Sequence, residues 1–222
     1  MKNGDSFNKW TVIASVVPDG CLAYHSALDF LGYQTQIFNH VQIASPTRFR
    51  PFSFEYENYT RVHDIPRIDI NKYRINGKPV FCPSLSQTII DCLKRPDLSG
   101  GMEEIMNVFL MLTPDKINFR TVTKVLNVYN SKSLWQRAGY LFELFGEETH
   151  PPKDFLSLCR YCTGNTHGTI REFGDKVYVN KWNLFVPSWL DNLTINGIKC
   201  QPLPSKDREH AIRPTLQADQ PQ

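Results

Sequence analysis

The sequence has no long hydrophobic run, no strong excess of charge of one sign and no dense set of cysteines. Its longest apolar stretches cover residues 10–17 and 108–112. Both are far shorter than the ~18 residues that a membrane-spanning helix needs. The first does not fit a signal peptide, because Asp5 stands where a basic region would be and Pro18-Asp19 follows the apolar stretch. We therefore expect a cytoplasmic protein with no membrane partner.

The weak charge and the few cysteines exclude further classes. The 222 residues include 25 Lys+Arg and 22 Asp+Glu, a net charge of +3 at pH 7. This balance is too mild to predict nucleic-acid binding by itself. The six cysteines are scattered along the chain, which indicates buried thiols rather than a disulfide framework. A chain of this length can form a core without a disulfide or a metal, and we expect no cofactor.

Sequence motifs typical of enzymes are missing as well. There is no Gly-rich phosphate loop, no His-Glu-x-x-His and no Gly-x-Ser-x-Gly. Cys21 stands four residues before His25, and Ser26 follows His25 directly. A Cys–His pair without a third group to orient it is a weak signal for a nucleophile and its base. The sequence thus favours a protein that is not an enzyme.

Hydrophobic periodicity predicts an α+β fold, in which a mostly antiparallel sheet is followed by a cluster of helices and a terminal hairpin. A helix over residues 21–31 ends at Gly32, and the sheet covers residues 36–82 with a hairpin turn at Asn76-Gly77. Ser84 begins the next helix, which Pro96 ends. Later helices are expected over residues 102–112, 116–129, 132–145 and 152–162.

The end of the chain changes character. Alternating apolar residues over 168–187 predict the terminal hairpin, with its turn around Gly174-Asp175. Residues 199–222 contain four prolines and no apolar period, which is typical of a disordered tail. We therefore expect one α+β domain over residues 1–198 and a Pro/Gln-rich tail over 199–222.

Basic residues gather within the predicted sheet, among phenylalanines and tyrosines. Cations bind phosphate groups and aromatic rings stack on bases, so this pattern is typical of nucleic-acid binding. Glu55, Glu57, Asp64 and Asp69 lie in the same stretch, however, and an ordinary solvated sheet face would look similar. The residues expected to bind are Arg48, Arg50, Arg61, Arg67, Lys72 and Arg74.

Two other patterns have plain structural alternatives. Cys159 and Cys162, with His150 and His167 nearby, could bind zinc, but a three-residue spacing on a helix also places two small side chains in the core. Helices around Asn130-Ser131 could form a helix-turn-helix that reads DNA through Lys132, Gln136 and Arg137. The second helix has a broad apolar stripe, which favours a buried helical hairpin.

Three stretches in order carry a resemblance to a known family: residues 12–33, 83–107 and 134–146. Together they resemble the antitoxin domain of the AbiEi abortive-infection family, which belongs to type IV toxin–antitoxin systems. The matching positions are Ser26, Ala27, Leu28 and Gly32, then Thr88, Ile89, Ile90, Asp91, Arg95, Pro96, Gly100 and Gly101, then Arg137, Gly139, Tyr140, Leu141 and Glu143.

The resemblance implies a protein that counteracts a cognate toxin of the nucleotidyltransferase type by binding and without catalysis. The antagonism in this family is often indirect, and nucleic acid is a second candidate partner. Members usually begin with a winged helix-turn-helix that binds the operon promoter, and this chain begins where their second domain begins. If the resemblance holds, the basic residues form the binding surface. Asp91, Arg95, Arg137 and Glu143 then form a structural charge network between helices.

Two other functions are alternatives to the antitoxin hypothesis. One is a nucleic-acid-binding transcriptional regulator. The other is a metal-dependent enzyme that processes nucleic acids, in which Asp91 and Glu143 would together hold a divalent ion. An ion pair of these carboxylates with Arg95 or Arg137 would favour the structural network instead.

Overall fold

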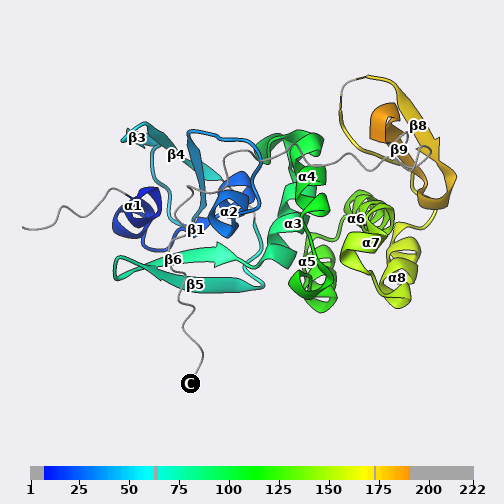
Figure 1. Ribbon diagram of the computed structural model, residues 1–222, viewed down its shortest axis with the longest axis horizontal. Helices are drawn as coiled ribbons and strands as arrows, with labels where there is room; N and C mark the ends of the chain where they lie inside the picture. Colours follow the sequence, from blue (N-terminus) through cyan, green and yellow to red (C-terminus); the bar gives the residue numbers. More distant parts are fainter. Residues whose placement is uncertain (1–7, 63–64, 173, 191–222) are drawn as a thin grey trace, which may run out of the picture.

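The structure is a computed structural model, and it describes residues 8–62, 65–172 and 174–190. It confirms the expected class: a mostly antiparallel sheet, a cluster of helices and a C-terminal hairpin. In Figure 1 the chain passes from the sheet at one end of the molecule, through a central group of helices, to the hairpin at the other end. The expected tail over 199–222 lies outside the described residues.

The large sheet has six strands in the order β3-β4-β2-β1-β6-β5. The pairs β1·β2, β3·β4 and β5·β6 are antiparallel, whereas β2·β4 and β1·β6 are parallel. The two parallel pairs were not expected from the sequence. The strands are β1 (Cys21–Leu22), β2 (His40–Ala44), β3 (Phe52–Phe54), β4 (Glu57–Val62), β5 (Ile70–Ile75) and β6 (Lys78–Pro83).

The predicted turn between β5 and β6 is confirmed. Asn76 and Gly77 both have positive φ, at 49° and 75°. A two-residue turn of this kind follows the right-handed twist of the flanking strands, and Asn-Gly adopts it at low cost.

Two helices cover one face of the sheet: α1 (Lys9–Val16) and α2 (Tyr24–Leu31). Their buried side chains, such as Trp10 and Phe30, share one core cluster with Val41, Ile43 and Tyr59 of the sheet. The expected cap of α2 is confirmed, because Gly32 has a φ of 79° and its N–H bonds back to the helix.

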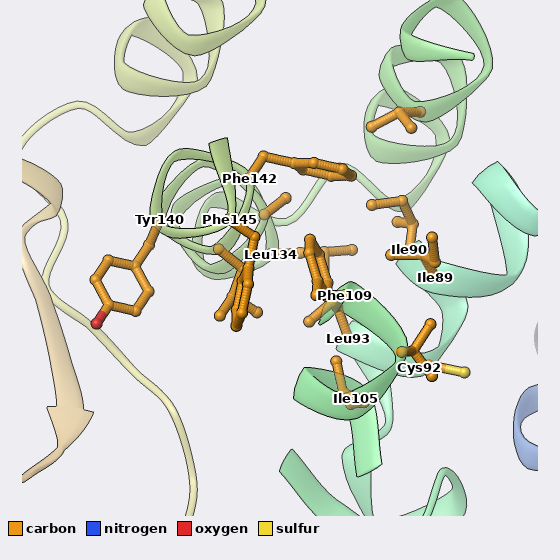
Figure 2. Close-up of a cluster of buried hydrophobic side chains, with 14 of the residues drawn as sticks. Ile89, Ile90, Cys92, Leu93, Ile105, Phe109, Leu134, Tyr140, Phe142 and Phe145 are labelled. Atoms are coloured by element: carbon orange, nitrogen blue, oxygen red, sulfur yellow. The ribbon is translucent and has the colours of Figure 1, made fainter. Parts of the chain in front are cut away.

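The helices after the sheet form a second core. They are α3 (Leu85–Lys94), α4 (Gly101–Leu110), α5 (Phe119–Tyr129), α6 (Lys132–Leu144), α7 (Gly146–Thr149) and α8 (Lys153–Thr163). Figure 2 shows Leu93 of α3, Phe109 of α4 and Phe142 of α6 meeting in this core. Ser84 caps α3 as expected, by accepting a hydrogen bond from the N–H of Gln87.

The C-terminal sheet has the order β7-β9-β8, with β7 (Gly168–Thr169), β8 (Lys176–Val179) and β9 (Leu184–Pro187). The hairpin joins β8 to β9, so its turn lies at residues 180–183, and the predicted turn at Gly174-Asp175 is wrong. Trp182 is buried in this turn and Asn183 has a φ of 48°. Packing of Trp182 therefore determines where the turn lies. The alternation of apolar residues continues through this turn, so the sequence pattern does not reveal its position.

Among the described residues, no helix has both the length and the apolar character needed to cross a membrane.

Candidate binding surface

Arg48 and Arg50 lie exposed in the loop between β2 and β3. The base of this loop is held by Asp19, whose carboxylate accepts hydrogen bonds from the Ser45 hydroxyl (2.8 Å) and the Thr47 N–H (3.3 Å). Hydrogen bonding from Thr47 and Ser45 keeps the pKa of Asp19 below its ordinary value. The two arginines thus project from a loop with an anchored base.

Arg61 and Arg67 donate to backbone carbonyls at the end of β2. Arg61 Nε donates to Ser45 O at 2.9 Å, and Arg67 Nη2 donates to Ala44 O at 3.3 Å and also to Asp19 O. Ser45 lies just past the end of β2, and a carbonyl oxygen outside the strand pairs needs such a donor. Both arginines therefore stabilise the sheet, whatever else they contact.

Lys72 and Arg74 belong to the edge strand β5, and both side chains are exposed. Between and beyond them, Tyr73 and Ile75 pack into the sheet core, so the two cations point to the opposite face. Since β4 and β5 are four positions apart in the sheet order, about 19 Å separates them at ~4.8 Å per strand. The six predicted binding residues thus fall into two groups: Arg61 and Arg67 contact the base of the loop that carries Arg48 and Arg50, and the β5 pair lies across the sheet.

The expected charge network is not formed, because in the described part of the chain no ion pair joins any two of Asp91, Arg95, Arg137 and Glu143. Asp91 is buried in α3 and accepts from the Tyr129 hydroxyl (2.7 Å) and from Gln87 Nε2 (3.3 Å). Burial raises the pKa of Asp91 to about 7, although both hydrogen bonds act in the opposite direction.

The two arginines of that prediction act separately. Arg95 forms an exposed ion pair with Asp97 at 2.7 Å, and this hydrogen bonding raises the pKa of Arg95. Arg137 is half-buried in α6 and donates to Leu93 O at 2.7 Å, at the end of α3. Burial lowers the pKa of Arg137 to about 10. Arg137 thus joins α6 to α3 through a carbonyl oxygen and not through a carboxylate.

Glu143 contacts the turn between β8 and β9 and helix α8. Its carboxylate accepts from Trp182 Nε1 at 2.9 Å and from Lys181 Nζ at 2.7 Å, and Arg160 lies 3.8 Å away. Asp91 and Glu143 therefore have separate partners on separate helices. The predicted metal pair of these two carboxylates is not formed.

The other candidates for chemistry are buried or have other partners. Cys21 is buried in β1, and burial raises its pKa to about 12. Cys159 is buried, and the His167 ring lies 2.9 Å from the Tyr178 hydroxyl. Within the described residues, no three side chains of the kinds that bind metals come together. Cys200 lies outside them.

Two of the residues predicted to read DNA from α6 are engaged inside the protein. Gln136 is fully buried, and its amide donates to Asn183 O at 3.2 Å. Arg137 is committed to Leu93 O. Helix α6 is therefore a core helix, as its apolar stripe indicated, and it packs most closely against α8.

One buried acid was not anticipated from the sequence. Glu104 of α4 accepts hydrogen bonds from Thr35 N (2.6 Å) and Gln36 N (3.3 Å), and His25 Nε2 lies 3.5 Å away. Burial raises the pKa of Glu104, but hydrogen bonds from His25, Thr35 and Gln36 outweigh that effect and leave it lowered. Glu104 thus anchors the loop after α2 to α4.

A groove between the sheet and the helices gathers cations and aromatic rings in one place. It has a volume of about 710 Å³. Among the described residues that line it, every charged one is a cation. We call it the cationic groove, and its main residues are Tyr24, Arg61, Lys94, Arg95, Val128 and Tyr129.

The sequence pointed to only part of this groove. Arg61 was expected to bind, whereas Arg95 was assigned to the charge network, and the two tyrosines and Lys94 were not considered. The adjacent cations Lys94 and Arg95 at the end of a predicted helix were the available signal. Their proximity to Tyr24 depends on how α2 and α3 pack, which no local pattern encodes.

Comparisons with known proteins give the fold alone. No protein-family model matches the chain, and no curated protein is similar enough to count as a relative. Among solved structures, the RV2827C protein from Mycobacterium tuberculosis is similar at a TM-score of 0.53 and 16% identity. The match covers 85% of this chain and 69% of that one. The two chains therefore share an architecture.

Proposed function

We propose that this chain is an antitoxin-like protein that counteracts a nucleotidyltransferase-type toxin by binding and without catalysis. The motif resemblance to the AbiEi family suggests this class. The observation that carries the proposal is the structural use of the polar residues in the three family-like stretches.

Each stretch contributes a residue that joins two elements. Ser26 Oγ accepts from Gln42 N at 2.8 Å and so joins α2 to β2. Asp91 joins α3 to α5 through Tyr129, and Arg137 joins α6 to α3 through Leu93 O. Side chains committed to such contacts hold a scaffold together and are poorly placed to act on a substrate. This use of the motif residues supports binding over turnover.

The exposed cations of the sheet region are the proposed contact residues. Arg48 and Arg50 on the loop and Arg74 on β5 are exposed, and exposed charges guide encounters with an oppositely charged partner. The two places they occupy suit a partner that covers a broad surface.

Growth measurements test the proposal. Cells express a nucleotidyltransferase-type toxin from the same genome, with or without the full chain. We expect the wild-type chain to restore growth and the variant Arg48→Glu/Arg50→Glu/Arg74→Glu to lose that effect. The matched control reverses three exposed lysines on other elements, Lys124, Lys153 and Lys176, and should protect like wild type. Protection by the arginine variant would exclude this surface.

A further inference from the structure

We propose that the cationic groove is a binding site for a nucleoside polyphosphate. The proposal concerns a different site from the loop and strand cations above, and it holds whether or not the chain counters a toxin. It follows from the charge, the aromatic lining, the strained backbone and the size of the groove.

The charged side of the groove offers donors to phosphate oxygens. Lys94 Nζ lies 5.4 Å from the centre of the Tyr129 ring, and in the described part of the chain no carboxylate pairs with it. Arg95 uses Nε and Nη2 on Asp97, which leaves the two N–H groups of Nη1 for another acceptor. Arg61 adds a third positive charge, while its Nε and Nη2 donate to Ser45 O and Pro46 O. Several cations together match several phosphate charges.

The other side of the groove suits a flat ring. Tyr129 and Val128 line it, and Val128 is 56% exposed, whereas Tyr24 is too deeply buried to present a ring face. An exposed valine beside the half-buried Tyr129 leaves apolar surface that a nucleobase can cover, and bases stack on aromatic rings without regard to sequence. A nucleotide has both parts, since its base is flat and its phosphates are charged.

Tyr24 has an unusual backbone conformation at this place. It is the first residue of α2 and is buried at 2% exposure, yet its φ is 49°. Positive φ in a bulky residue is strained, and such strain concentrates at functional sites. Tyr24 lines the same groove as Arg95 and Tyr129, so the strained residue belongs to the wall of the proposed site.

Two helix ends beside the groove weaken its attraction for an anion, and the groove cations must outweigh them. Both α3 and α5 end there, and carbonyls at a helix C-terminus carry partial negative charge. Arg137 Nη1 donates to Leu93 O of α3, and the Asn130 N–H donates to Leu126 O and Asn127 O of α5. These carbonyls therefore already have donors. The groove volume of about 710 Å³ also lies within the usual range of small-molecule sites.

Titration calorimetry of the purified full chain tests the proposal, with ATP, inorganic triphosphate and adenosine as separate probes. We expect ATP to bind one to one, and triphosphate and adenosine each to bind at least about tenfold more weakly, because each lacks one half of the contacts. Triphosphate binding as tight as ATP would reduce the site to a phosphate site and overturn the proposal. An oligonucleotide that competes for the groove more strongly than ATP would overturn it too.

Charge-neutral variants locate the binding. Lys94→Gln/Arg95→Gln should weaken ATP binding by about tenfold or more, since each charge-assisted hydrogen bond contributes strongly. The control Lys153→Gln/Lys176→Gln removes two exposed lysines on α8 and β8 and should bind like wild type. Both variants change surface residues, and their thermal unfolding shows whether they fold. Absent ATP binding in wild type, or equal binding in wild type and the groove variant, would contradict the proposal.

Discussion

The Tyr129 hydroxyl donates a 2.7 Å hydrogen bond to Oδ1 of Asp91, across a sequence separation of 38 residues. One of these residues lines the cationic groove and the other is a buried acid in the helical core. The position of the Tyr129 ring in the groove thus depends on a carboxylate that solvent does not reach. This contact links stability to the shape of the proposed ligand site.

The variant Tyr129→Phe should destabilise the protein. It removes the hydroxyl and leaves Asp91 with Gln87 Nε2 as its remaining partner. An unsatisfied buried polar group costs about 1–3 kcal/mol, which urea unfolding measures directly. The control Tyr161→Phe changes a tyrosine that is 85% exposed, and it should leave stability within about 0.5 kcal/mol. Equal stability of both variants would argue against the bond.

Stability should fall as pH rises through the range where Asp91 titrates. Its pKa is about 7 in the folded chain against an ordinary value of 3.8. Between these values the folded state holds a proton that the unfolded state has lost. The free energy of unfolding therefore decreases from about pH 4 to about pH 7, by at most ~1.4 kcal/mol per pH unit from this one group.

Asp91→Asn removes this titration and identifies its source. The contribution of Asp91 to the pH profile should vanish between pH 4 and pH 7, while contributions of other groups remain. Urea unfolding of both proteins at several pH values gives the difference. A profile that does not change on substitution would mean that Asp91 is ionised in the folded state throughout.

Gly139→Ala should destabilise the contact between α6 and the C-terminal hairpin. A Cβ at this position would overlap the Trp182 ring and lie 2.9 Å from Cys159 Cβ. Overpacking of this kind costs about 1–3 kcal/mol. The control Gly146→Ala meets no atom within 4 Å and should be neutral or slightly stabilising. Thermal unfolding of both variants tests this prediction. A Gly139→Ala variant as stable as wild type would mean that Trp182 does not pack against Gly139.

The two arginines of the family-like stretches should differ in their effect on stability. Arg137→Met leaves Leu93 O without its side-chain donor and should cost about 1–3 kcal/mol. Arg95→Met breaks an exposed ion pair with Asp97, which is worth at most about 1 kcal/mol. Denaturant midpoints measured side by side give the comparison. A larger loss of stability from Arg95→Met than from Arg137→Met would contradict this prediction.

The parts of the fold that the sequence predicted depend on local chemistry. Asn76-Gly77, the Ser84 cap and the Gly32 cap act within a few residues, so their patterns identified the elements. The hairpin turn was misplaced because it depends on Trp182, whose partner Glu143 lies 39 residues away. A pattern of alternation carries no information about such a contact.

The candidate site was harder to predict for the same reason. Basic residues that are close in sequence, such as Arg61 and Lys72, belong to strands that the sheet order separates. Conversely, Tyr24 and Lys94 come from distant segments and line one groove. The sequence identified residue types suited to binding, but strand order and helix packing decide which of them meet.

Growth rescue is the most direct test of the central claim that this chain neutralises a toxin by binding. Cells that express a nucleotidyltransferase-type toxin from the same genome are grown with the wild-type chain or with Arg48→Glu/Arg50→Glu/Arg74→Glu. We expect normal growth with wild type and arrested growth with the variant. Arrested growth with wild type, at full expression of the folded chain, would contradict it.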